Sequence, residues 1–432
     1  MSSERPGSAT VRRRCDVGYK LVLKISITAV VAVVFGTMVN VNGRAETGVA
    51  GLRPAAAQNV TPAPSTAAVP GTAWGDPDLQ GIWSVELLVP LERPVGVTTE
   101  FYTDEQVAEL DTARAGKSVF GNHLRAAPGT EADVTGAYNA VYTSQRPTGQ
   151  RTAMIIDPPD GKMPSYTPVA LERQAAYRQY QLALLQNTQV CRDNEFACQG
   201  GQYGPPSPRL LEDPPEYPSA GVGPINRADG PEDRGLSERC MTGNLPSIRG
   251  GFVGVYRRIV QSPGGVTIYY DAAQGQGFSR NIPITTAPHL PSNLRQWWGD
   301  SRSQWEGETL VVDVTNFTPK TDFQGSRENL HIVERWTRTG PDTLEVVSTF
   351  EDPTVWTRPW TVIQEFKMQS NEANRIYTEP RCHEGNFGMV GALAGARAVE
   401  KAYEEGSDRH PASLCIGACG LNTEGLDPLA LR

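Results

Sequence analysis

The sequence predicts a mainly β protein with peripheral helices, built on an antiparallel β-barrel or sandwich that is decorated by long loops. Three features of the second half support this: runs rich in Val, Thr and aromatic residues, alternation of apolar and polar positions, and short turn sequences between runs. The runs cover residues 252–261, 266–271, 281–285, 301–305, 309–317, 330–338, 343–351 and 360–368. A barrel is favoured over a sandwich because closure leaves no exposed strand edge.

Residues 295–317, RQWWGDSRSQWEGETLVVDVTNF, are the stretch around which the predicted sheet is organised. The EGE turn at residues 306–308 joins two strand-like runs into a hairpin. The mouth of this hairpin carries the carboxylates of Asp300, Glu306 and Asp313. Two more hairpins are expected around the turns SPGG at residues 262–265 and TGPD at residues 339–342.

Helices are expected outside the sheet, where capping signals precede apolar periodicity. Residues 103–115 begin with a capping box, in which Gln106 follows Thr103 by three positions. Residues 167–186 have Thr167 as the cap and a proline in the first turn. A third helix is expected at residues 388–405, and short strands at residues 81–85 and 151–157.

The N-terminus predicts export. Basic residues between positions 12 and 24 precede an apolar run at residues 25–39, which suits a signal peptide and is short for a membrane span. Residues 1–45 are therefore a signal peptide or, if uncleaved, a membrane anchor. An Ala/Pro/Thr linker at residues 46–72 and a single β-rich domain at residues 73–432 follow. The expected location is periplasmic or secreted.

Cysteine usage agrees with an oxidising compartment. The chain has seven cysteines, one of which lies in the predicted N-terminal segment. The expected disulfide pairs are Cys191–Cys198, Cys415–Cys419 and Cys240–Cys382, although spacing alone does not fix the pairing. The first pair lies in a loop excursion expected at residues 187–223. Zinc bound by thiolates is the alternative, but no C-x-x-C spacing supports it.

Composition limits the possible partners. The formal net charge of the 432 residues is −8 and basic residues form no stripe, so no nucleic-acid partner is expected. No G-x-S-x-G motif, phosphate loop or dinucleotide motif follows a strand, and no cofactor is predicted. The expected partner is a small apolar or partly apolar molecule, with membrane contact only if the N-terminal segment is uncleaved.

Candidate acid–base residues gather in the β-rich half, where three of the five histidines lie beside acids and aromatic residues. Acid–base catalysis needs a group that titrates near neutrality and a carboxylate that orients it. The candidate catalytic residues are His289, Asp300, His331, Glu334, His383 and Glu384, with Asp313 as a further partner carboxylate. The candidate ligand-binding residues are Trp298, Trp305, Trp336 and, for an anion, Arg335. No metal site is predicted, because H-x-H and H-x-x-H spacings are missing.

Strand alternation constrains this site at residues 330–338. Glu334 shares the apolar face with Trp336, while His331 faces the other way. A carboxylate on the apolar face is costly unless paired, so Glu334 is either a pocket residue or half of a structural ion pair. We expect His289, Glu334 and His383 to converge on one pocket walled by the three tryptophans. His331 and Glu334 cannot both point inward unless a bulge separates them.

Several sequence blocks carry a resemblance. WGDPDLQGIW at residues 74–83, DSRSQWEGETLVVDVTNF at residues 300–317 and CHEGN at residues 382–386 resemble a family of exported bacterial proteins with no assigned activity. The resemblance covers roughly residues 73–405; it implies export and says almost nothing about chemistry. The WEGETLVV segment is also similar to strands of lipocalin-like barrels, which is a likeness of fold alone.

Three functions follow as hypotheses. The first is an exported enzyme that processes a small molecule by histidine and carboxylate chemistry, as a lyase, isomerase or hydrolase. The second is a non-catalytic protein that binds an apolar small molecule in a cavity lined by tryptophan. The third is a structural protein of the cell envelope. Convergence of the histidines and acids in one pocket would favour the enzyme, and scattered histidines would favour binding.

Overall fold

The computed structural model describes residues 70–114, 146–193, 202–213, 226–235, 238–239, 245, 247–248, 256–271, 278–370 and 387–413. These residues belong to one compact unit, Ala63–Arg432. The predicted export segment, five of the six later cysteines, His383 and Glu384 lie outside the described residues. Within the described ranges, no helix combines the length and the apolar character needed to span a membrane.

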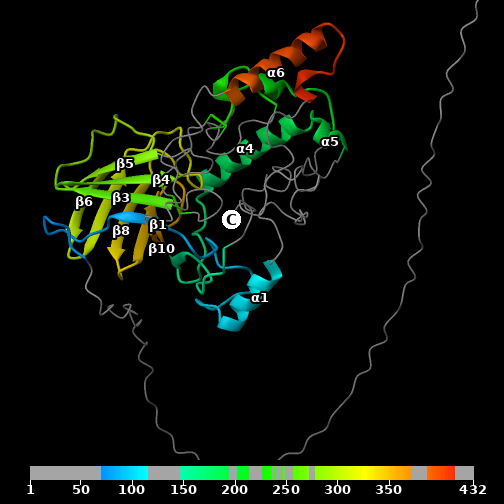
Figure 1. The fold of residues 1–432 in the computed structure, drawn as a ribbon. Coiled ribbons are helices and arrows are strands. Elements are labelled where there is room, and N and C mark those ends of the chain that lie inside the picture. Colours follow the sequence, from blue (N-terminus) through cyan, green and yellow to red (C-terminus); the bar gives the residue numbers. More distant parts are fainter. Residues whose placement is uncertain are drawn as a thin grey trace, which may run out of the picture. The chain divides into compact units, whose positions relative to one another are not determined.

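The structure is mainly β: a nearly closed antiparallel barrel, with helices elsewhere in the described chain (Figure 1). Its strands are β1 (Gly81–Ser84), β2 (Ile155–Asp157), β3 (Tyr256–Ser262), β4 (Gly265–Asp271), β5 (Phe278–Pro283), β6 (Asp300–Glu306), β7 (Thr309–Thr315), β8 (His331–Arg338), β9 (Thr343–Glu351) and β10 (Trp360–Gln369). The three hairpins expected from turn chemistry are β3–β4, β6–β7 and β8–β9. The barrel prediction is confirmed, with strand order β5-β4-β3-β1-β10-β9-β8-β7-β6.

The two ends of this strand order meet at β5 and β6. Ile284 and Ser303 form a parallel bridge there. Ser303 Oγ donates to the carbonyl of Pro283 at 3.0 Å, and the Thr285 amide donates to the Ser303 carbonyl at 2.9 Å. These few bonds close the cylinder at one point, so the barrel has a seam.

Strand β1 comes from the start of the domain and completes the sheet between β3 and β10 (Figure 1). Trp83 pairs with Arg257 on one side and with Met368 on the other. The short β2 pairs with the start of β10, where the register shifts between Thr361 and Val362. The barrel therefore needs two segments from the first half of the chain.

The core lies inside the barrel and follows the two-residue period of the strands. On β7, Leu310, Val312 and Val314 are buried, and the residues between them are only partly covered. An aromatic cluster fills one end, where Phe350 packs against Trp360 with ring centroids 4.6 Å apart and against Phe323 at 5.1 Å. Alternation thus separates an inner face from an outer face on every long strand.

Helices form at the three predicted places, two of which carry capping signals: α1 (Asp104–Arg114), α4 (Pro168–Leu185) and α6 (Phe387–Glu404). At α1, Thr103 and Gln106 each bond the backbone amide of the other, as in a capping box. At α4, Thr167 Oγ1 accepts from the Ala170 amide at 3.2 Å and donates to the Thr354 carbonyl at 2.7 Å. The second bond ties this helix to the segment before β10.

The excursion expected at residues 187–223 is more regular than predicted. Its described part contains α5 (Gln189–Asp193) and the 3₁₀ turn η2 (Pro208–Leu211). Cys191 on α5 is buried and disulfide-bonded, and its partner lies outside the described residues. The disulfide pairings therefore stay predictions. Two more 3₁₀ turns are η3 (Pro231–Asp233) and η5 (Pro411–Ser413).

Phe350→Ala tests the aromatic cluster. Removing a fully buried ring leaves a cavity, so we expect a loss of about 3–5 kcal/mol in the free energy of unfolding. Val260→Ala, at an outward position that is 52% exposed, is the matched control and should cost well under about 1 kcal/mol. Urea unfolding followed by tryptophan fluorescence measures both. Equal costs would contradict the assignment of inner and outer faces.

Candidate functional site

Histidines and carboxylates form a network on the outer face of the barrel, which we call the outer network: His289, Asp300, Asp313 and His331. Asp300 begins β6, Asp313 lies near the end of β7, and His331 begins β8, so antiparallel pairing brings all three to one end. His289 comes from the loop before β6. Its Nδ1 lies 2.9 Å from Asp300 Oδ2, and its Nε2 lies 2.8 Å from Asp313 Oδ1.

His289 bridges two carboxylates, and this geometry suits a structural role better than the role of a general base. Both of its ring nitrogens face carboxylate oxygens at hydrogen-bond distance, so neither nitrogen is directed at a substrate in this arrangement. Asp300 is 7% exposed and also accepts from the Leu290 amide at 3.0 Å, which fixes the loop against the strand.

His331 extends the outer network to β9. Its Nε2 lies 3.2 Å from Asp313 Oδ2, and its Nδ1 lies 3.7 Å from Glu351 Oε2. The hydrogen bond to Asp313 raises the pKa of His331, although partial burial opposes the shift. The bond from His331 lowers the pKa of Asp313 in turn. The pair is therefore a mutually stabilised imidazolium and carboxylate on a half-exposed surface.

No group of three or more His, Cys, Asp or Glu residues is arranged to hold a metal ion in the part of the chain that the structure describes.

A second polar group lies inside the barrel, and we call it the inner cluster: Arg257, Tyr270, Arg280, Glu334 and Trp336. Arg280 Nη1 forms an ion pair with Glu334 Oε2 at 2.6 Å, and both side chains are almost completely buried. Trp336 Nε1 donates to the same carboxylate oxygen at 3.3 Å. Glu334 thus lies on the inner face beside Trp336, as strand alternation predicts, and it has a cation as its partner.

Arg257 is the least satisfied member of the inner cluster. It is 3% exposed, and its guanidinium carbon lies 4.2 Å from the ring centroid of Phe366, 5.2 Å from that of Tyr270 and 5.9 Å from that of Trp336. Its Nη2 donates to the Ser247 carbonyl. Burial lowers the pKa of Arg257, but an arginine stays protonated at any physiological pH.

Three guanidinium nitrogens of this cluster have no hydrogen-bond partner among the described residues: Arg257 Nε, Arg257 Nη1 and Arg280 Nη2. The cluster also holds two cations and one carboxylate. A third inward arginine, Arg338, differs because it bonds the Asp78 carbonyl at 2.8 Å and lies 4.0 Å from the Asp78 carboxylate. Among the residues that the structure describes, the interior around Arg257 therefore has an excess of positive charge and of donors.

The structure does not bring the sequence-predicted site residues together in one pocket. His289, Asp300 and His331 belong to the outer network, whereas Glu334 points into the barrel from the opposite face of β8. No bulge interrupts the pairing of β8 with β7 or β9, so alternation keeps the two sets apart. The expected convergence of His289 and Glu334 is therefore wrong. His383 and Glu384 lie outside the described residues.

The predicted ligand-binding residues also lie in different parts of the barrel. Trp336 is buried inside the barrel, and Trp298 stacks on Phe278 with ring centroids 4.4 Å apart. Trp305 is half-buried and packs against the core. Arg335 faces outward and pairs with Glu306 at 2.8 Å, and its predicted role in binding an anion stays a prediction.

Sequence reasoning missed Arg257 and Arg280. The signal that could have found them is again alternation: Arg257 is in phase with Ile259 on β3, and Arg280 is in phase with Phe278 and Ile282 on β5. An arginine at an apolar, inward position of a strand costs free energy to bury, as a carboxylate does, and therefore needs a partner.

No family model matches the sequence, and no curated protein matches it either, so the resemblance to exported bacterial proteins stays a prediction. Among solved structures, the chain is similar to a mutant of the fluorescent protein UnaG, at 13% identity over 27% of this chain and 71% of that one, with a TM-score of 0.18. It is also similar to secretory abundant heat soluble protein 4 from Ramazzottius varieornatus, at 13% identity over 27% and 69%, with a TM-score of 0.18. At these TM-scores the likenesses carry no functional argument.

Asp313→Asn tests the outer network through pH. The raised pKa of His331 stabilises the fold below the unfolded value of about 6.5, and the lowered pKa of Asp313 stabilises it above about 3.9. The variant should therefore lose most stability near pH 5–6, by about 0.5–1 kcal/mol because the pair is half-exposed and screened. The difference should shrink as pH rises through the pKa of His331. Urea midpoints across pH measure it.

Glu308→Gln makes the same change of carboxylate to amide at an exposed turn of this hairpin and serves as the control. Its effect should be small at every pH. A loss in Asp313→Asn that is constant from pH 5 to 9 would contradict the role of His331.

Glu334→Gln tests the inner cluster. It leaves two buried arginines with no counter-charge, so we expect a loss of about 3–5 kcal/mol in unfolding free energy. The double variant Arg280→Met/Glu334→Leu removes both charges and should recover most of that loss. Glu306→Gln, which breaks the exposed pair with Arg335, should cost less than about 1 kcal/mol. A double variant less stable than Glu334→Gln would show that the pair itself stabilises the barrel.

Proposed function

We propose that this protein is a non-catalytic binding protein that holds a small carboxylate-bearing molecule in the barrel interior. The observation that carries the proposal is the set of unpartnered guanidinium nitrogens on Arg257 and Arg280. Guanidinium groups suit carboxylates because they offer two parallel N–H donors in a fixed geometry. A bound carboxylate would supply both the missing acceptors and the missing negative charge.

The existing carboxylate of the cluster does not fill this role. Glu334 Oε2 already accepts from Arg280 and Trp336, at 2.6 and 3.3 Å. No ion pair joins Glu334 to Arg257 in the described part of the chain. Two buried cations beside one carboxylate leave one charge uncompensated in a region of low dielectric, where that costs most.

The rest of the ligand is expected to be apolar or aromatic. The rings of Tyr270, Trp336 and Phe366 surround the Arg257 guanidinium, and Phe278 stacks on Tyr270 with centroids 4.7 Å apart. Binding sites for small molecules combine such apolar walls with a few placed polar groups. A molecule with an apolar body and one carboxylate matches this composition.

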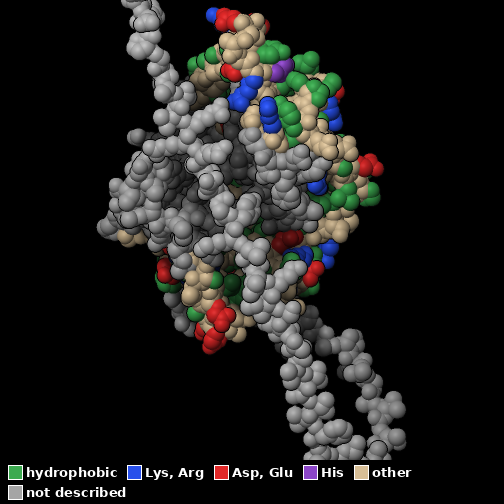
Figure 2. Space-filling view, turned by 90° about the vertical axis from the view of Figure 1, so that its right-hand side faces the viewer, with side chains coloured by type: hydrophobic (Ala, Val, Ile, Leu, Met, Phe, Trp, Pro, Cys, Tyr) green, Lys and Arg blue, Asp and Glu red, His purple; other side chains and the backbone are tan. Residues whose placement is uncertain are grey.

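An acid–base enzyme has less support. The residues expected to act together, His289 and Glu334, lie on opposite faces of the barrel wall, and both nitrogens of His289 face carboxylates. Binding through surface charge has little support either, since Figure 2 shows acidic and basic side chains mixed over the described surface of one face. We place the protein outside the cytoplasm, periplasmic or secreted, on the strength of its N-terminal sequence alone.

Calorimetric titration of the full chain with decanoate and with benzoate tests the proposal. Decanol and decylammonium, which have the same apolar tail as decanoate but a neutral or cationic head, are the ligand controls. We expect saturable binding of at least one carboxylate and no comparable binding of the controls. Arg257→Met keeps the apolar stem and should weaken binding about tenfold or more, as expected for the loss of a charge-assisted hydrogen bond.

Arg335→Met makes the same substitution on an outward-facing arginine of the same barrel and should leave binding unchanged. Equal binding of decanol, equal losses in the two arginine variants, or no binding of either carboxylate would overturn the proposal. Thermal unfolding of each variant checks that the barrel stays folded.

A further inference from the structure

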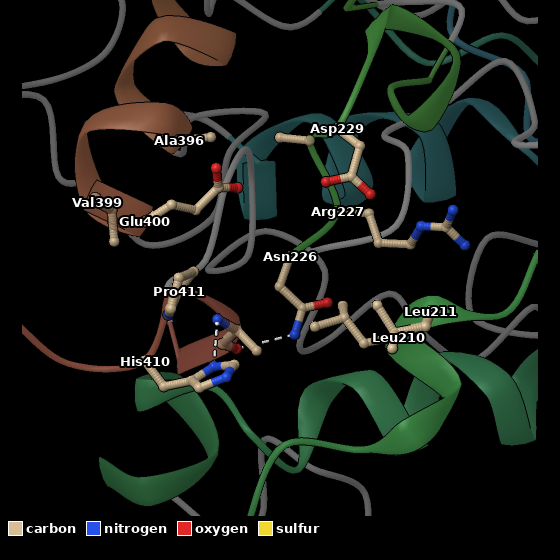
Figure 3. Close-up of a pocket in the computed structure, with 12 residues that line it drawn as sticks. Leu210, Leu211, Asn226, Arg227, Asp229, Ala396, Val399, Glu400, His410 and Pro411 are labelled. Carbon is tan, nitrogen blue, oxygen red and sulfur yellow. Dashed lines mark hydrogen bonds between the residues drawn. The ribbon is translucent and has the colours of Figure 1, made fainter. Parts of the chain in front are cut away.

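A cavity of about 190 Å³ lies among elements outside the barrel sheet. It is bounded by η2, residues 226–229, α6 and η5 (Figure 3). These elements are tied together around it: Asn226 Nδ2 donates to the Ala412 carbonyl at 2.9 Å, and Arg397 Nη2 donates to the Ala228 carbonyl at 2.9 Å. The cavity therefore belongs to a locally fixed arrangement.

Apolar and polar side chains are mixed in the lining of the cavity. Leu210, Leu211, Val399 and Pro411 contribute aliphatic surface, and Leu211 is 87% exposed. Asp229 and Glu400 contribute carboxylates (Figure 3), and the side chain of Asp229 is 77% exposed. An amphipathic lining of this kind suits a ligand that has a polar head and a short apolar body.

Asn226 is a buried polar residue of the lining. It is 6% exposed, and its Nδ2 donates to two backbone carbonyls, those of Leu184 at 3.0 Å and Ala412 at 2.9 Å. Because both of these neighbours are acceptors, the orientation of the amide is fixed by its bonds. Its Oδ1 has no hydrogen-bond partner in the described part of the chain. A buried acceptor at a cavity wall is costly unless a donor reaches it.

The charges around the cavity favour a cationic donor. Arg227, which also lines it, pairs with Asp233 at 3.1 Å and is neutralised by it. Asp229 and Glu400 share one cation, since their oxygens lie 3.5 and 2.6 Å from Arg397 Nη2. Two carboxylates beside one guanidinium leave an excess of one negative charge among the described residues here.

We propose that this cavity is a second binding site, which takes a primary ammonium group carried on a short aliphatic chain. An ammonium has donors and no acceptor, so it suits the unpartnered Asn226 Oδ1, and its positive charge suits the carboxylates of Asp229 and Glu400, which share one guanidinium. The chain would lie against Leu210 and Leu211. The cavity is smaller than the roughly 300–1,000 Å³ of sites for drug-sized molecules, which limits the ligand to a few carbons. The site is independent of the barrel interior.

Binding of n-butylammonium to the full chain, followed by saturation-transfer NMR and calorimetry, tests this site. We expect saturable binding, with n-butanol binding at least about tenfold more weakly because it lacks the charge. Glu400→Gln keeps the shape of the side chain and should weaken butylammonium about tenfold. Glu308→Gln, the same change at an exposed turn of the barrel, should leave binding unchanged.

Leu211→Ser alters the apolar wall at an exposed position where it cannot disturb packing, and it should weaken butylammonium several-fold. Arg257→Met should not affect this site, which separates a failure here from a failure of the barrel proposal. The inference is overturned by absence of saturable butylammonium binding, by equal binding of butanol, or by equal effects of Glu400→Gln and Glu308→Gln.

Discussion

Arg280 on β5 and Glu334 on β8 are not neighbours in the sheet, yet their side chains meet at 2.6 Å inside the barrel. Arg280 Nε also donates to Ser301 Oγ on β6 at 2.9 Å. The buried bonds of one arginine therefore join strands on both sides of the seam, where β5 and β6 share a single bridge. Either charge alone would be strongly destabilising in the interior, so the two side chains have to meet when the strands that carry them close into the barrel.

The sequence predicts local pairing well and distant pairing poorly. Turn chemistry locates the hairpins β3–β4, β6–β7 and β8–β9, because a short turn fixes which strands meet. It cannot show that β1 lies between β3 and β10, since that contact closes a loop of more than a hundred residues and leaves no local pattern. The helix α5 was missed because a segment rich in Gly and Pro follows it and obscures its short apolar signal.

At the candidate site, too, the sequence predicts local features well and distant contacts poorly. Alternation on β8 predicts that Glu334 and His331 face opposite ways, and it needs only the pleat of one strand. Which partner each residue finds depends on the curvature of the whole barrel, which brings Arg280 to Glu334 and the loop at His289 over Asp300. Alternation on β3 and β5 likewise predicts that Arg257 and Arg280 point into the barrel, but a pattern of histidines beside acids does not include them.

A purely structural account of the inner cluster needs only Arg280 and Glu334. That pair joins the strands at the seam and neutralises itself. Arg257 adds a second buried cation. Its aromatic neighbours stabilise part of this charge, because ring faces attract a guanidinium. The rings do not replace strong acceptors for its N–H groups. An apolar side chain at this position would fill the same space at lower cost. The anion proposed above would account for the arginine, because it would supply acceptors for the unsatisfied donors.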